Sequence, residues 1–157
     1  MNKPIVGVIG TGIMGAPMAR NLLRAGFSVG VFNRTPAKAD GICAEGATWR
    51  NSPADVARSA DVVISVVSDS PDVEAVYLGK EGVGSGIRPG SLCIDISTVA
   101  PETARAVALE LRNRGAAFID APVSGGKTGA EAGTLSIMVG GEEADAGRAR
   151  PVLEVLG

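Results

Sequence analysis

Three glycines near the start of the chain, Gly10, Gly12 and Gly15, could let a backbone approach a charged group closely. They have the spacing GxGxxG within the stretch VIGTGIMGAPMARNL. The first glycine permits a tight turn, the second lets a phosphate approach the backbone, and the third lets a helix pack closely on a strand. N–H groups at the start of that helix would face the phosphate. The spacing alone is weak evidence, because the chain contains 22 glycines and a tight turn needs no ligand.

The residues around this motif strengthen the interpretation. The apolar run Ile5–Ile9 predicts a strand buried on both faces, and Ile13–Ala25 has helical spacing and stops at Gly26. A GxGxxG between a strand and a helix, in the first βαβ unit, is typical of dinucleotide binding. The residues that we expect to hold the pyrophosphate are Gly10, Gly12, Ile13, Met14 and Gly15.

A second group of residues follows the next predicted strand, Phe27–Phe32. An NAD site usually has Asp or Glu at this point to bind the ribose hydroxyls. Here Asn33 and Arg34 follow the strand, and a guanidinium pairs with a 2′-phosphate that a carboxylate would repel. Thr35 and the next helix add donors, and Lys38 adds charge. These residues favour NADP over NAD; the alternative is that Arg34 is an ordinary solvated side chain.

Strands and helices alternate along the rest of the sequence. Further strands are predicted at 62–67, 91–96, 118–119 and 135–139, and further helices start at Thr35-Pro36, Ser52-Pro53, Pro71, Pro101 and Glu142. This alternation predicts a Rossmann-type, doubly wound α/β fold, in which a mainly parallel sheet has helices on both faces. We expect one domain over residues 1–157. Because a βα pattern usually continues with a strand, we expect this domain to be truncated before its last strand.

Composition argues against several classes of function. The formal net charge is −2, with no block of basic residues, so we expect no binding to nucleic acid or to anionic membranes. The chain lacks histidine, and Cys43 and Cys93 stand far apart, so we expect no metal site and two buried, reduced thiols. Neither a signal peptide nor an apolar run of membrane-spanning length is evident, and we expect a cytoplasmic protein.

Several stretches of the chain together resemble one family. GTGIMGAPMARNL, FNRTPAK, IDISTVAPET and DAPVSGGKTGAEAGTLSIMVGG occur in this order. They resemble the β-hydroxyacid dehydrogenases, which include 3-hydroxyisobutyrate dehydrogenase, tartronate semialdehyde reductase and the glyoxylate/succinic semialdehyde reductases. The last stretch is the most specific, because a generic dinucleotide fold has no reason to contain it. The resemblance covers essentially the whole chain and implies the N-terminal, NADP-binding domain of such an enzyme.

The resemblance also implies further site residues. Ser124, Gly125 and Gly126 match the segment that binds the carboxylate of a small carboxylic-acid substrate, and a hydroxyl with two glycine N–H groups suits an anion. The alternative is a glycine-rich loop without a ligand. Positions that match residues close to the cofactor are Val67, Ser68 and Thr98.

The resemblance finally implies a reaction. In the complete enzyme, a hydride would pass between NADP(H) and a small β-hydroxyacid, semialdehyde or keto acid, and a lysine would give the carbonyl oxygen its proton. Relatives carry this lysine in a G-x-x-G-x-x-x-K-x-x-N pattern that follows the present segment. We therefore expect no catalytic residue in this chain, a catalytic Lys beyond residue 157, and an absent C-terminal helical domain. We expect these residues alone to be inactive, and the full-length form to be a homo-oligomer assembled largely through the helical domain.

Four other interpretations fit parts of the sequence. APVSGGKT nearly fits an ATP-binding phosphate loop, but Ala121 replaces its first glycine and Pro122 removes a donor. Imine reductases share GxGxMG and NRT but lack VSGG. The substrate of 6-phosphogluconate dehydrogenase needs a cationic cluster that the loops do not show. The alternative from another class is a non-catalytic nucleotide-binding module.

Overall fold

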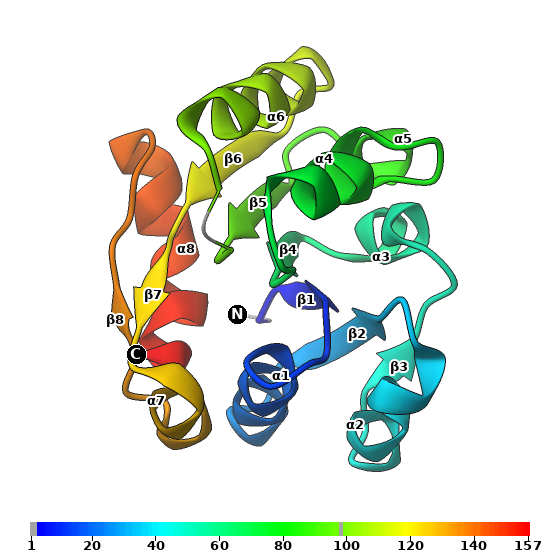
Figure 1. Cartoon of the computed structure of the whole chain (residues 1–157), viewed down its shortest axis with the longest axis vertical. Helices are drawn as coiled ribbons and strands as arrows, with labels where there is room; N and C mark the ends of the chain where they lie inside the picture. The colour runs from blue at the N-terminus through cyan, green and yellow to red at the C-terminus, as the bar shows by residue number, and fades with distance from the viewer. Residues whose placement is uncertain (1–2, 98) are drawn as a thin grey trace.

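A six-stranded parallel sheet forms the centre of the molecule. The computed structural model describes residues 3–97 and 99–157 (Figure 1). The strands lie in the order β3-β2-β1-β4-β5-β6 and all neighbouring pairs are parallel. Their bounds are β1 Ile5–Ile9, β2 Ser28–Phe32, β3 Thr48–Trp49, β4 Val62–Ser65, β5 Leu92–Asp95 and β6 Ala117–Asp120. This arrangement confirms the predicted Rossmann-type, doubly wound α/β fold.

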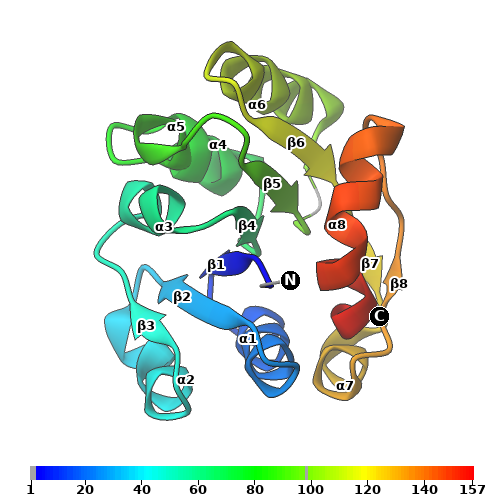
Figure 2. The ribbon, with the colours of Figure 1, turned by 180° about the vertical axis from the view of Figure 1, so that it is seen from behind.

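Helices cover both faces of the sheet, as Figure 1 and the view from behind in Figure 2 show. One face carries α1 Gly15–Arg24, α2 Asp40–Ala44, α7 Gly126–Ala132 and α8 Glu143–Leu156. The other carries α3 Pro53–Ser59, α4 Ser70–Leu78, α5 Val83–Gly86 and α6 Pro101–Asn113. None of these described helices is long and apolar enough to cross a membrane.

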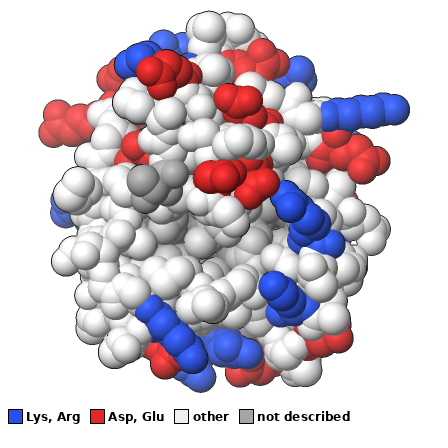
Figure 3. All heavy atoms as spheres, in the orientation of Figure 1, with Lys and Arg blue, Asp and Glu red and all other residues white. Residues whose placement is uncertain are grey.

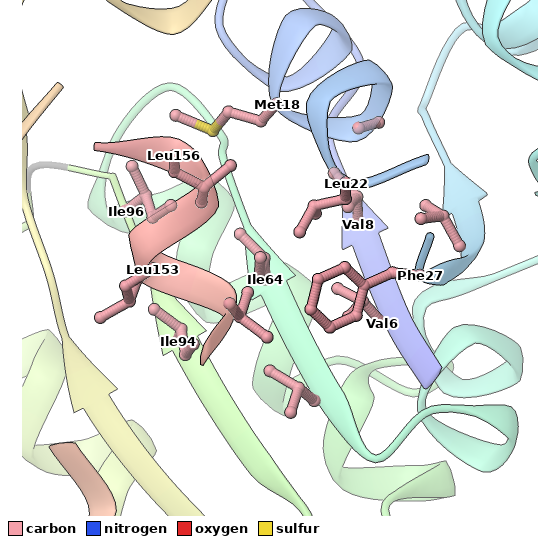
Figure 4. Packing of buried hydrophobic residues seen from close by; sticks show 14 of the residues in the cluster. Val6, Val8, Met18, Leu22, Phe27, Ile64, Ile94, Ile96, Leu153 and Leu156 are labelled. Carbon is pink, nitrogen blue, oxygen red and sulfur yellow. The ribbon is translucent and has the colours of Figure 1, made fainter. Parts of the chain in front are cut away.

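The central strands are buried on both faces, which explains their unbroken apolar runs. On the α1 and α8 face, Val8 and Ile64 pack with Leu22 and Leu153 in one cluster (Figure 4). Alternate residues such as Val63 point into a second cluster on the other face. Two clusters on opposite faces hold the sheet rigidly and so fix the strand ends from which the loops emerge.

The two cysteines differ in their surroundings. Cys93 lies in β5 and is fully buried, and burial raises the pKa of its thiol strongly. Cys43 in α2 is only partly buried, so the expectation that both thiols are buried is wrong for this residue. Both are free thiols.

The segment after β6 departs most from the predicted pattern. β7 (Val123–Ser124) and β8 (Ser136–Ile137) form an antiparallel pair in a second, two-stranded sheet, instead of a further parallel strand over 135–139. The connection holds only α7 and short turns, and a parallel crossover needs a dozen or more residues. Sequence periodicity also missed α7, β3 and α5, whose short lengths give little periodic signal.

The segment after β2 also differs from its prediction. A 3₁₀ turn at Pro36–Ala39 precedes α2, and Thr35, where the sequence predicts a helix to start, makes no side-chain capping hydrogen bond. By contrast, Ser52, at the predicted start of the next helix, caps α3, because its hydroxyl accepts a hydrogen bond from the Asp55 N–H.

Candidate functional site

A groove of about 530 Å³ lies where the C-terminal ends of β1, β2 and β4 meet. Ends of this kind are where open α/β sheets bind ligands. Predicted site residues that line it are Gly10, Gly12, Ile13, Met14, Gly15, Asn33, Arg34, Thr35, Val67 and Ser68. Thr98 lies outside the described residues. Figure 3 shows that the face of Figure 1 is hollowed near its centre, with acidic side chains at the upper edge of the hollow and basic side chains to its right.

The first and third glycines of the motif are required by the fold. Gly10 has a φ of 101°, and a Cβ there would lie 2.0 Å from the carbonyl oxygen of Val66. A Cβ on Gly15 would lie 1.7 Å from the carbonyl oxygen of Gly10. These contacts bring the loop onto the end of β4 and the start of α1 onto the loop, as the spacing predicts.

Gly12 differs from both, because no feature of the fold requires a glycine there. Its φ is not in the positive region, and a Cβ would have no atom within 4 Å. The space that a side chain would fill lies in the groove. A glycine that neither the backbone conformation nor the packing demands is explained by close approach of a ligand.

The backbone around Gly12 presents N–H groups to this space. Within the part of the chain that the structure describes, the N–H groups of Gly12, Ile13 and Met14 have no hydrogen-bond partner. The helical pattern begins only at Ala16, whose N–H donates to the Gly12 carbonyl at 3.0 Å. Unpaired N–H groups at a helix start, together with the helix dipole, form an anion-binding cradle.

Asn33 braces the glycine loop against the end of β2. Its Oδ1 accepts a hydrogen bond from the Thr11 N–H at 2.9 Å, and its Nδ2 donates to the Thr35 carbonyl at 2.9 Å. Both ends of the amide are therefore engaged, which fixes the segment that carries Arg34 relative to the cradle. An aspartate could accept the first hydrogen bond but could not donate the second.

Arg34 and Lys38 bring positive charge to the end of the groove beside β2. The side chain of Arg34 is 80% exposed, and its Nη2 lies 2.9 Å from Oδ1 of Asp72, in the first turn of α4. A guanidinium has five N–H donors in a planar fork, so one such contact leaves donors for a second anion.

A buried polar network lies beneath the groove. Tyr77 Oη lies 2.7 Å from Ser65 Oγ, and Ser65 Oγ donates to Oδ1 of Asp95 at 2.8 Å. Since the Ser65 proton points to Asp95, Tyr77 is the donor to Ser65. Ser97 joins the network through its N–H, which donates to Asp95 Oδ1 at 3.3 Å, and its Oγ accepts from the Val67 N–H at 2.8 Å. The network thus positions the Val67 backbone that lines the groove.

Asp95 is fully buried, and its Oδ2 has no partner among the described residues. Burial raises the pKa of this carboxyl to about 6, although hydrogen bonds from Ser65 and Ser97 lower it. The neighbouring Asp120, on β6, contributes a smaller increase through its charge. The carboxyl therefore takes up a proton in mildly acidic solution, well above the range of an ordinary aspartate.

The predicted substrate segment, Ser124 to Gly126, is not part of the groove lining. It forms an exposed turn between β7 and α7, and both glycines have positive φ, 132° and 59°. α7 lies beside α1, where Asn21 Nδ2 donates to the Ala130 carbonyl at 2.8 Å. Its Lys127 lies 3.7 Å from Glu131 on an exposed face of the helix. The turn therefore neighbours the helix that starts at the cradle but remains a separate feature.

Comparison with known proteins decides which family has this arrangement. A family model for the NAD binding domain of 6-phosphogluconate dehydrogenase matches residues 5–157. The chain belongs to this family. It is an NAD(P)-binding domain of the β-hydroxyacid dehydrogenase type, which confirms the resemblance seen in the sequence.

Two solved structures and one curated relative illustrate the similarity of this NAD(P)-binding domain to known enzymes. The NAD-dependent L-serine dehydrogenase of Pseudomonas aeruginosa is 47% identical over 97% of this chain and 51% of its own length. The structure of Mycobacterium tuberculosis 3-hydroxyisobutyrate dehydrogenase with L-serine superposes with a TM-score of 0.93, at 40% identity over 99% of this chain and 53% of the other. Psf3 in complex with NADP+ and 2-OPP superposes with a TM-score of 0.92, at 38% identity over 97% and 54%. The chain spans about half the length of these relatives.

The groove of the NAD(P)-binding domain fits a dinucleotide. The open space at Gly12 and the unpaired N–H groups beside it suit a pyrophosphate, and the cations at β2 suit a further phosphate. No cluster of three or more metal-ligating side chains occurs within residues 3–97 and 99–157.

Sequence reasoning missed two residues of this NAD(P)-binding domain that act on the site. Asp72 contacts Arg34 across the groove, and Ser97 holds the backbone of Val67. Asp72 lies in a DSPD stretch, where an acid in the first turn of a helix is already explained by the helix dipole. Ser97 precedes Thr98, the residue that the family resemblance singled out. No pattern in the sequence distinguishes either residue from an ordinary polar one.

Proposed function

We propose that this domain belongs to an oxidoreductase that prefers NADP(H) over NAD(H) and acts on a small β-hydroxyacid or the related semialdehyde or keto acid. The observation that carries the cofactor preference is Arg34, which lies at the end of β2, lines the groove and has its guanidinium at the groove edge. Ribose recognition in NAD sites places a carboxylate at this point, and Asn33 replaces it here.

The relatives do not distinguish between NAD and NADP, so the proposed preference is argued from the residues of this chain. One is an NAD-dependent dehydrogenase at 47% identity, and another was solved with NADP+ at 38% identity. Family membership thus supports either cofactor. The guanidinium of Arg34 and the ammonium of Lys38 favour the cofactor with the additional phosphate, because both pair with its negative charge.

Each part of the groove has a role in this proposal. The N–H groups of Gly12, Ile13 and Met14 bind the pyrophosphate, while Asn33 holds the loop in register with β2. Val67 and Ser68 lie beside the nicotinamide. The bound cofactor supplies or accepts the hydride, and the chain orients it.

The proposed substrate and its binding residues are argued from the relatives of this chain. We propose that Ser124, Gly125 and Gly126 bind the substrate carboxylate, with Thr98 near cofactor and substrate, and that a lysine in a segment following residue 157 supplies the proton. Support comes from the relative named an L-serine dehydrogenase and from the structure solved with L-serine, since serine is a small β-hydroxyacid. We also propose that the whole protein has a further strand in this sheet and a helical domain. We propose that it forms a homo-oligomer and is located in the cytoplasm.

Titration of the protein with NADPH and NADH tests the cofactor preference. We expect NADPH to bind more tightly, and Arg34→Ala to weaken NADPH binding about tenfold to a hundredfold, the loss typical of one charged hydrogen bond. NADH binding should change less than twofold. Arg58→Ala is the matched control, because Arg58 is exposed on α3, away from the groove. Equal affinities for the two cofactors in the unmodified protein would show that Arg34 is only a surface charge.

Turnover is tested in the full-length protein. With NADP+ and L-serine or 3-hydroxyisobutyrate it should form NADPH, detected by absorbance. Tight NADPH binding without turnover on any small β-hydroxyacid would favour a non-catalytic nucleotide-binding module instead.

A further inference from the structure

We propose that Asp72 is a specificity-determining residue, which competes with the 2′-phosphate of NADP(H) for the guanidinium of Arg34 and so limits the preference for this cofactor. This inference rests on the proposed function, because it assigns Arg34 to the 2′-phosphate. Asp72 lies outside both the glycine motif and the end of β2.

The position of Asp72 carries the inference. It lies in the first turn of α4, 38 residues beyond Arg34 in sequence, yet its Oδ1 contacts Arg34 Nη2 at 2.9 Å. The side chain of Asp72 is 26% exposed, against 80% for Arg34. Both residues line the same groove. The carboxylate is thus held by a helix at the groove edge, where it meets the cation that would bind the phosphate.

The charges determine the direction of the effect. A 2′-phosphate carries up to two negative charges, and on Arg34 it would share one guanidinium with the Asp72 carboxylate. Two anions on one cation repel each other, so Asp72 weakens binding of the phosphate. The 2′-hydroxyl of NAD(H) has no charge and can donate a hydrogen bond to a carboxylate. Asp72 therefore penalises binding of NADP(H) and imposes no such penalty on NAD(H).

The opposite role for the same contact makes the opposite prediction. If Asp72 orients Arg34 toward the phosphate, its loss weakens NADP(H) binding. Because Arg34 is mostly exposed and has donors to spare, orientation by a single hydrogen bond contributes little. Competition is therefore the larger effect.

Minimal ligands isolate the contribution of the 2′-phosphate. Affinities of the protein for 2′,5′-ADP and 5′-AMP are measured by calorimetry at low and physiological salt. We expect Asp72→Asn to tighten 2′,5′-ADP binding about threefold to tenfold, the range for a partly exposed charge interaction, and to change 5′-AMP binding less than twofold. The gain should decrease at higher salt. In the Arg34→Ala background, it should fall below twofold.

Asp69→Asn is the matched control. It makes the same charge change at the N-cap of α4, where Asp69 accepts a hydrogen bond from the Asp72 N–H, but it does not contact Arg34. We expect a change below twofold. Asp72→Ser, checked by thermal unfolding without ligand, provides a second variant if Asp72→Asn disturbs the helix start.

The outcomes separate this inference from the proposed function. If the unmodified protein binds 2′,5′-ADP no more tightly than 5′-AMP, the NADP preference itself fails. If that preference is present but Asp72→Asn leaves it unchanged or reduces it, only the role of Asp72 is overturned. Equal tightening of both ligands, or an equal effect of Asp69→Asn, would also overturn it, because a general charge effect does not determine specificity.

Discussion

The loop Gly10–Gly15, at the end of the parallel strand β1, and the turn Ser124–Gly126, at the end of the antiparallel strand β7, are both rich in glycine, but the glycines have different causes. In the turn, Gly125 and Gly126 have positive φ, so the backbone alone requires glycine. In the loop, Gly12 has neither a positive φ nor a neighbour within 4 Å of a Cβ.

The difference shows which glycines are evidence for a ligand. A glycine that the fold requires would be present with or without a bound molecule. Gly12 is not required in this way, so its identity points to a ligand in the groove. The proposed cofactor site is therefore supported by geometry as well as by the family, whereas the proposed substrate role of Ser124–Gly126 is supported by the family alone.

The largest expected effect is on cofactor binding by Gly12→Val. Its side chain would occupy the space in front of the unpaired N–H groups of Ile13 and Met14. Loss of two charged hydrogen bonds corresponds to about 4 kcal/mol, or a thousandfold weaker NADPH binding. The free energy of unfolding without ligand should change by less than about 1 kcal/mol. Calorimetric titration and thermal unfolding measure the two quantities.

Gly15→Ala is the control with the opposite signature. Its methyl group would lie 1.7 Å from the Gly10 carbonyl oxygen, so we expect a loss of about 3 kcal/mol in unfolding free energy before any ligand is added. If Gly12→Val lowered the apo stability as Gly15→Ala does and kept the NADPH-induced rise in melting temperature, Gly12 would be a structural glycine like Gly126.

The groove differs from the turn also in the buried carboxyl of Asp95, which is linked through Ser97 to the Val67 backbone in the groove lining and makes stability depend on pH. Asp95 has a pKa of about 6 in the folded protein and 3.8 as its ordinary value. Between these values the unfolded chain has lost the proton that the folded chain keeps. The free energy of unfolding is therefore highest, as far as Asp95 is concerned, below about pH 4. It falls as pH rises to about 6, by up to about 3 kcal/mol.

Asp95→Asn should abolish this dependence. The measurement is urea unfolding of both proteins between about pH 4 and pH 7, compared as a difference because other carboxyls titrate in the same range. The stability of the unmodified protein relative to Asp95→Asn should fall with rising pH. Glu110→Gln, which removes an exposed partner of Arg114, should reproduce the unmodified curve. A difference that stays constant with pH would contradict the raised pKa of the buried Asp95 carboxyl.

The sequence predicts which residues line the groove at the ends of β1 and β2, because the determinants of this groove are local. The strand Ile5–Ile9, the three glycines and Asn33-Arg34 lie within one βαβ unit, whose parallel pairing places the ends of β1 and β2 side by side. The roles of Gly10 and Gly15 followed from their spacing and are confirmed by the contacts. The sequence places Asn33 only beside the expected cofactor, whereas its hydrogen bonds to Thr11 and Thr35 show that it braces the glycine loop.

The features that the sequence did not predict depend on contacts between distant segments. Asp72 reaches Arg34 only because α4 starts beside β2 across the groove. Ser65, Tyr77 and Asp95 form a network through side chains from three elements, and no spacing rule connects them. The antiparallel pair β7 and β8 depends on a turn built from Gly125 and Gly126. The sequence shows that this segment is rich in glycine, but it does not show in which direction the chain leaves the turn.

The smallest expected effect is that of Gly126→Ala. A methyl group at this position would meet no atom within 4 Å, so the cost comes only from a φ of 59°, which an L-residue adopts at about 1 kcal/mol. We expect the unfolding free energy to fall by this amount, measured by urea unfolding, and NADPH affinity to change less than twofold. Thr128→Ala, a neutral change on the exposed part of α7, should leave both quantities within error. If Gly126→Ala weakened NADPH binding as strongly as Gly12→Val, the turn would be part of the cofactor cradle. The two glycine segments would then form one site, because a turn that serves only the backbone cannot change the affinity for a ligand bound elsewhere.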